Sequence, residues 1–144
     1  MLRSFAVAMI LAGLCSAGQA QDDVKRPPLH VPEAADTALQ FVPSGWRVEG
    51  VPKEVDLNGD GKPDAALVIS HGGIGEPGDG ALVVVKHVLV LALRGPDGKL
   101  HRSIVSDAAI LDGDEGGMFG DPFEDLSIEH GAVAIMHYGG SRDR

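Results

Sequence analysis

The amino-acid sequence predicts a mainly β fold, an antiparallel meander of about six strands with one short N-terminal helix. Glycine accounts for 20 of 144 residues and proline for 9, which indicates many tight turns rather than long helices. Short runs rich in valine, isoleucine and leucine recur along the chain, and turn-forming residues separate them.

The first expected elements are a helix over residues 33–42 and a strand over residues 46–51. Within residues 33–42 the apolar residues recur at helical spacing, and Pro43 ends the segment. From Trp46 to Val51, apolar and charged residues alternate, as in a strand with one buried face.

Five further strands are expected at residues 65–70, 81–94, 100–106, 126–129 and 132–138. The apolar run over residues 81–94 contains five valines among its fourteen residues, which favours a strand over a helix. Gly95–Gly98, with proline second and glycine fourth, predicts a turn. The pair His130-Gly131 predicts a two-residue hairpin turn between the last two strands.

Residues 1–20 have the three parts of a cleavable export signal. Arg3 supplies a positive charge, residues 5–15 form a short apolar run, and residues 18–20 form a small-residue cleavage site before Gln21. The expected location is therefore the periplasm or the outside of the cell, with no membrane span. The alternative is a lipid anchor at Cys15, which the preceding leucine disfavours because lipid attachment sites follow a small residue.

The rest of the chain is expected to form a flexible linker over residues 21–32 and one β-rich domain over residues 33–144. Because the chain ends directly after an expected strand, we expect this domain to be cut short of its natural sheet. Removal of the signal leaves 11 basic and 21 acidic residues, a net charge of −10. This charge argues against nucleic acid and anionic membrane surfaces as partners.

The segment Asp56–Asp64 has a residue pattern that suits a cation. Oxygen-bearing side chains occupy positions 1, 3, 5 and 9 of this loop, namely Asp56, Asn58, Asp60 and Asp64. Gly61 permits the sharp turn that directs the main-chain carbonyl of Lys62 toward the same centre. An all-oxygen cage suits a hard cation of calcium size, so Ca²⁺ is the expected cofactor. The alternative is a polar turn between two strands.

The run Asp56–Val68 resembles the FG-GAP (VCBS-like) repeats of integrin-α-type β-propellers and of many exported bacterial proteins. The resemblance implies a calcium-binding hairpin loop whose ligands are Asp56, Asn58, Asp60, Asp64 and the carbonyl of Lys62. It also implies propeller-blade-like hairpins, although this chain is too short to close a propeller. An EF-hand fits less well, because Leu67 stands where its bidentate glutamate would lie.

A second group of acids lies in a glycine-rich loop expected over residues 107–124, and consists of Asp112, Asp114, Glu115 and Asp121. Their spacing matches no known cation cage, so a solvated acidic loop is favoured over a second cation site. Paired carboxylates in a loop can also perform acid–base chemistry. A hydrolase site, if the chain has one, is expected here.

Three functions are compatible with these features. The first is an exported calcium-binding β-domain in which Ca²⁺ holds the hairpin loop in shape and which is not an enzyme by itself. The second is a surface module that binds a cell-envelope polymer or a protein, which an exposed apolar patch beside the loop would support. The third and least favoured is a carboxylate-dependent hydrolase, which two carboxyls facing each other across a cleft would support.

Overall fold

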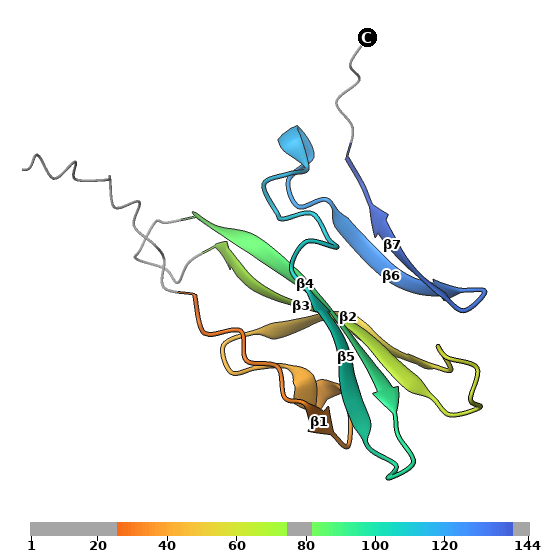
Figure 1. Ribbon diagram of the computed structural model, residues 1–144. Coiled ribbons are helices and arrows are strands. Elements are labelled where there is room, and N and C mark those ends of the chain that lie inside the picture. The colour runs from red at the N-terminus through yellow and green to blue at the C-terminus, as the bar shows by residue number, and fades with distance from the viewer. Residues whose placement is uncertain (1–25, 75–81, 140–144) are drawn as a thin grey trace, which may run out of the picture.

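The computed structural model describes residues 26–74 and 82–139, and these residues form seven strands (Figure 1). The strands are β1 (Ala34–Ala35), β2 (Arg47–Val55), β3 (Asp64–Ile74), β4 (Leu82–Arg94), β5 (Leu100–Ser106), β6 (Phe123–Glu129) and β7 (Ala132–His137). The expected export signal, including Cys15, and the first residues of the expected linker lie outside the described residues.

The strands form two antiparallel sheets, and the predicted mainly β, antiparallel fold is confirmed. Five strands, in the order β1-β5-β4-β3-β2, make a sheet that curls as a half-barrel. Strands β2 to β5 follow one another in this sheet, as expected of a meander. The β6–β7 hairpin does not extend that sheet and forms a separate two-stranded sheet.

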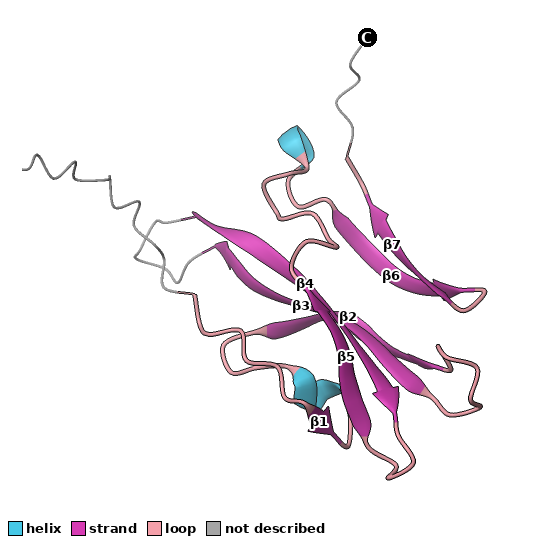
Figure 2. Ribbon diagram, in the orientation of Figure 1, coloured by secondary structure: helices cyan, strands magenta, loops and turns pink. Residues whose placement is uncertain are grey.

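The helix expected over residues 33–42 is not confirmed. This segment instead contains the two-residue strand β1 and a single 3-10 turn, Ala38–Phe41, drawn in cyan near β1 in Figure 2. The buried residues of the turn are Ala38 and Phe41, which are three residues apart, whereas Leu39 is 57% exposed. A spacing of three matches the 3-10 repeat, so the apolar side chains reach the core without a longer helix.

Residues 26–32, expected to belong to a flexible linker, lie against the large sheet. The side chain of Val31 is buried in the core, and its carbonyl accepts a 2.6 Å hydrogen bond from Arg102 Nη1 on β5. The indole N–H of Trp46 donates to the carbonyl of Pro27 at 3.3 Å. Composition alone did not reveal these contacts, because the hydrogen-bond partners lie 71 and 19 residues away in the sequence.

Apolar side chains cover both faces of the central strands. On β3, Ala65, Leu67 and Ile69 face a core cluster that includes Phe41 and Leu100, while alternate residues face a second cluster. The second cluster contains Leu126 and Ile110 and is covered by apolar residues of β6 and β7. The β6–β7 hairpin therefore covers one face of the sheet. Burial on both faces explains why β3 and β4 are nearly continuous apolar runs.

The two-residue turn predicted between the last two strands is present in the structure. His130 and Gly131, between β6 and β7, both have positive φ, at 51° and 77°, as a tight two-residue hairpin turn requires. Across the part of the chain that is described, helical structure is limited to 3-10 turns, and none has the length and apolar character needed to cross a membrane.

Candidate metal centre

The predicted metal loop connects β2 to β3 at one end of the large sheet. Val55, the last residue of β2, pairs with Asp64, the first residue of β3, so residues 56–63 close a hairpin. Gly59 and Gly61 have φ values of +77° and +80°, which favour glycine over residues with a side chain. These two residues allow the chain to curl within a few positions.

The carboxylate of Asp56 organises the first part of the loop. Its Oδ1 accepts hydrogen bonds from the N–H groups of Asn58, Gly59 and Asp60 at 3.2, 2.7 and 3.2 Å, and its Oδ2 accepts from Gly61 N–H at 2.8 Å. These bonds stabilise the charged form, that from Gly61 most, and hold the pKa of Asp56 below its ordinary value of 3.8 despite an opposing desolvation effect. Asp56 is therefore an anion in the folded loop at neutral pH.

The next side chains curl toward their own backbone. Asn58 Oδ1 accepts a hydrogen bond from Asp60 N–H at 3.3 Å, and Asp60 Oδ1 accepts one from Lys62 N–H at 2.9 Å. The side chains of Asn58 and Asp60 both lie in the exposed part of the loop. Such local bonds keep the oxygens of Asn58 and Asp60 inside the curl rather than in free solution.

Asp64 differs from the other acids of the loop because it is fully buried. Its Oδ2 accepts from Leu57 N–H at 2.7 Å, and its Oδ1 accepts from Arg94 N–H at the end of β4 at 2.8 Å. Each carboxylate oxygen has two acceptor sites, so these bonds leave capacity for a cation. Asp64 therefore links the loop to the sheet and also belongs to the donor set.

The fold brings three of the predicted ligands together. Asp56, Asp60 and Asp64 each present a carboxylate oxygen, and these three oxygens lie within 4.8 Å of one another. With the amide oxygen of Asn58, the donors are all hard oxygens and carry three negative charges, which fits Ca²⁺ and does not fit a soft metal. Within residues 26–74 and 82–139, this is the group that gathers three metal-ligating side chains.

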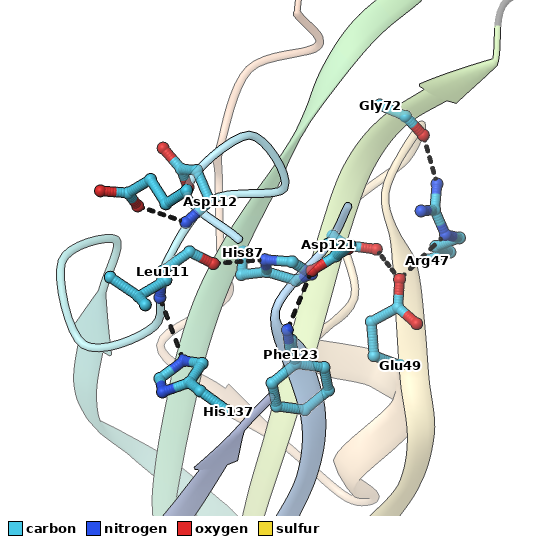
Figure 3. Close-up of polar contacts among 11 residues, drawn as sticks. Arg47, Glu49, Gly72, His87, Leu111, Asp112, Asp121, Phe123 and His137 are labelled. Atoms are coloured by element: carbon cyan, nitrogen blue, oxygen red, sulfur yellow. Dashed lines mark hydrogen bonds and ion pairs between the residues drawn. The ribbon is translucent and has the colours of Figure 1, made fainter. Parts of the chain in front are cut away.

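The second acidic group does not converge in the same way. Asp112 Oδ2 lies 3.0 Å from Lys86 Nζ. Asp121 Oδ2 lies 3.1 Å from the Nε2 atom of buried His87, and Figure 3 shows these two side chains together. The His87 contact is within ion-pair distance but lacks hydrogen-bond geometry. The opposite ring nitrogen, Nδ1, donates to the carbonyl of Leu111 at 2.8 Å.

The other two acids of this group, Asp114 and Glu115, do not take part in the contacts with Lys86 and His87. Glu115 Oε2 accepts a 2.6 Å hydrogen bond from Asp112 N–H, and Asp114 is exposed. The loop also borders a cavity of about 260 Å³, whose polar side chains are Glu115, His137 and Tyr138. Glu115 is the one carboxylate that lines this cavity, so the paired carboxyls that a hydrolase would need do not face each other across it.

Sequence reasoning missed one residue that contacts the candidate metal centre, Arg94. Its main chain binds Asp64, and its guanidinium donates to the carbonyl of Pro63 at 2.8 Å. Its only signal in the sequence is a lone charge at the end of an apolar strand, directly before the Gly95–Gly98 turn. The partner lies about 30 residues away, so no local pattern could reveal the contact.

No protein-family model matches this chain, and comparison with curated proteins and with solved structures gave no significant match.

Proposed function

We propose that this chain is an exported calcium-binding β-domain in which Ca²⁺ holds the loop between β2 and β3 in shape. The observation that carries this proposal is the approach of the Asp56, Asp60 and Asp64 carboxylates to within 4.8 Å of one another. Three anions this close repel one another, and a divalent cation between them removes that repulsion. The resemblance of the loop to FG-GAP repeats supports the same assignment.

The ligands proposed for Ca²⁺ are Asp56, Asn58, Asp60, Asp64 and the main-chain carbonyl of Lys62. The ion would supply positive charge to a loop whose glycines and exposed acids otherwise contribute little packing. These five protein oxygens would leave few positions of a Ca²⁺ ion open, whereas a catalytic metal keeps a position free for substrate. The role we propose for the ion is therefore structural, and the domain is not an enzyme by itself.

Calorimetry with Ca²⁺ on the chain that begins at Gln21 tests this function. We expect one site with a dissociation constant of about 10⁻⁴–10⁻³ M, since the loop lacks the bidentate glutamate of tight sites. Asp60→Ala should abolish the heat of binding. Asp114→Ala removes an equally exposed acid from the other loop and should leave it unchanged. Equal heats in the two variants would contradict the assignment.

Calcium should also stabilise the fold, because the ligands meet only in the folded hairpin. At a Ca²⁺ concentration ten times the dissociation constant, the expected gain is about 1.4 kcal/mol. Thermal melting in Ca²⁺ and in chelator measures this gain. Coincident melting curves would exclude a structural role for the ion even if calorimetry detected binding.

Export is the second part of the proposal, and it rests on the signal pattern of residues 1–20. Mass spectrometry of the exported protein should find Gln21 as the first residue. A lipid-modified Cys15 at the N-terminus would instead show that the protein is anchored to a membrane.

A second candidate function, a surface binding module, is favoured by an apolar patch on β2. Strand β2 has a register shift between Glu49 and Lys53, and within it Val51 is 75% exposed. Val51 and the exposed Leu39 line a shallow cavity of about 340 Å³, and the same strand leads into the metal loop. Binding of the protein to isolated cell envelopes, lost in Val51→Asp and kept in Val105→Asp on β5, would support this function.

A further inference from the structure

Arg94, the last residue of β4, contacts the metal loop and the turn between β4 and β5 at the same time. Its main-chain N–H donates to Asp64 Oδ1 at 2.8 Å, and its Nε donates to the carbonyl of Pro63 at 2.8 Å. Its Nη1 donates to the carbonyl of Gly98 at 2.7 Å. One residue therefore holds the carboxylate of a proposed ligand, the peptide before that ligand, and the neighbouring turn.

The guanidinium of Arg94 has no carboxylate partner among the described residues, so its donors serve main-chain carbonyls. A guanidinium is a planar fork whose N–H groups have fixed directions, and it orders two acceptors relative to each other. Here the two acceptors belong to different loops, at Pro63 and Gly98. The position of Asp64 is thus determined from the β4–β5 side of the sheet and not by the metal loop alone.

We propose that Arg94 is a positioning residue for the calcium site, and that it couples Ca²⁺ binding to the order of the β4–β5 turn. This inference rests on the proposed function, because it concerns the same ion. Outer-shell groups that hold a metal ligand in place typically change metal affinity by about 10–100-fold when they are removed. Arg94 holds Asp64 through its main chain and holds the preceding peptide through its side chain.

The positive charge of Arg94 has the opposite effect on a cation. Charge repulsion alone predicts that removal of the side chain strengthens Ca²⁺ binding, whereas positioning predicts that removal weakens it. The side chain is partly exposed, so solvent screens its charge, while its hydrogen bonds remain directional. We therefore expect positioning to prevail, and the direction of the change in affinity decides between the two effects.

The coupling has a consequence for the turn itself. In the β4–β5 turn, Gly95 N–H donates to Lys99 O at 2.8 Å and Gly98 N–H donates to Gly95 O at 3.0 Å. If Ca²⁺ fixes Asp64, and through Arg94 the carbonyl of Gly98, these amides should open less often. Because coupling between two sites is reciprocal, Ca²⁺ should slow their hydrogen exchange.

The test compares Ca²⁺ affinity and amide exchange in the chain that begins at Gln21 and in three variants. Arg94→Met removes the fork and the charge, and Arg94→Lys removes the fork alone. Both leave the main-chain bond to Asp64 in place. The matched control is Arg102→Met on β5. This substitution removes a similar hydrogen bond, from an arginine side chain to the main-chain carbonyl of Val31.

We expect about tenfold weaker Ca²⁺ binding in Arg94→Met and a smaller loss in Arg94→Lys. We expect unchanged affinity in Arg102→Met. Ca²⁺ should protect the Gly95 and Gly98 amides in the unmodified protein and in Arg102→Met, but not in Arg94→Met. Melting curves in chelator show whether each variant is folded. If Arg94→Met does not fold, the comparison of Arg94→Lys with the unmodified protein still tests the proposal.

Wild-type affinity in Arg94→Lys would overturn the role of the fork, and tighter binding in Arg94→Met would show that repulsion prevails. A loss in Arg102→Met equal to that in Arg94→Met would reduce the effect to general destabilisation. In each of these cases the unmodified protein still binds Ca²⁺, so only the role of Arg94 fails. If the unmodified protein gives no heat with Ca²⁺, the proposed function fails instead.

Discussion

The metal loop over residues 56–64 and the acidic loop over residues 112–121 have similar compositions and different geometries. Both are rich in glycine and carry several carboxylates. In the metal loop, the carboxylates of Asp56 and Asp60 bond to backbone N–H groups of their own loop and stay close to Asp64. In the acidic loop, Asp112 forms an ion pair with Lys86 on β4, and Asp121 Oδ2 lies 3.1 Å from His87 Nε2.

The difference shows that spacing, and not acidity, decides whether carboxylates gather. Alternate positions in a curled loop direct side chains inward, so acids at positions 1, 5 and 9 can share a centre. The acids at residues 112 and 121 are separated by a glycine-rich stretch and lie near basic or imidazole groups of the sheet. Asp112 attaches the loop to β4 through Lys86, and the two acids lie against different residues of the strand instead of sharing one centre.

The largest expected difference between the loops is in stability without metal. Asp64→Ala leaves the N–H groups of Leu57 and Arg94 without their acceptor, and each buried donor left unpaired costs about 1–3 kcal/mol. Because both bonds are only partly buried, we expect a loss in the lower part of the summed range, about 2–4 kcal/mol in the free energy of unfolding, measured with urea in chelator. Asp60→Ala, at an exposed site, is the control and should lose far less. Equal losses in the two variants would show that Asp64 does not anchor the loop.

A smaller effect is expected in the acidic loop. Asp112→Ala removes the ion pair with Lys86, whose side chain is 21% exposed. The substitution keeps the hydrogen bond from the main-chain N–H of residue 112 to the Glu115 carboxylate. A partly exposed ion pair of this kind contributes about 0.2–1 kcal/mol. Urea unfolding should show a loss of that size, and calorimetry should show unchanged Ca²⁺ binding. Weakened Ca²⁺ binding in this variant would mean that the two loops are not independent.

The pH dependence of the calcium-free metal loop is expected to be confined to acid. The N–H groups around Asp56, that of Gly61 foremost, lower its folded-state pKa below 3.8. A lowered pKa contributes stability above the ordinary value, and that contribution is lost as the pH falls through the folded-state value. NMR titration in chelator should find the Asp56 carboxyl and the Gly61 amide shifting together below pH 3.8. A midpoint at or above that value would contradict the hydrogen-bonded loop.

The smallest expected effect is on catalysis. The acidic loop borders a cavity with one carboxylate, Glu115, and the other acids of the loop do not line it. A screen of the chain that begins at Gln21 against hydrolase substrates should therefore detect no turnover, and Asp114→Ala/Glu115→Ala should behave identically. Turnover that this double substitution abolishes would favour the hydrolase function over the structural one.

Several features of the fold could be predicted from local patterns. The apolar runs indicated strands β3 and β4, and the Gly95–Gly98 turn indicated that β5 follows. The sequence His130-Gly131 indicated the turn between β6 and β7. The helix expected over residues 33–42 was not confirmed, because apolar spacing in so short a segment fits a 3-10 turn as well as an α-helix. The placement of the β6–β7 hairpin over a sheet face was also not predictable, since it depends on apolar contacts between distant strands.

The sequence alone determined that residues 56–64 can curl into a set of oxygen donors, because the required glycines and acids lie within nine positions of one another. Tertiary structure decided what holds that set in place. Asp64 is oriented by Arg94, about 30 residues later, and Asp112 forms an ion pair with Lys86 on β4. Local geometry follows from neighbouring residues, whereas a partner across the sheet is set by strand order and register, which only the folded chain defines.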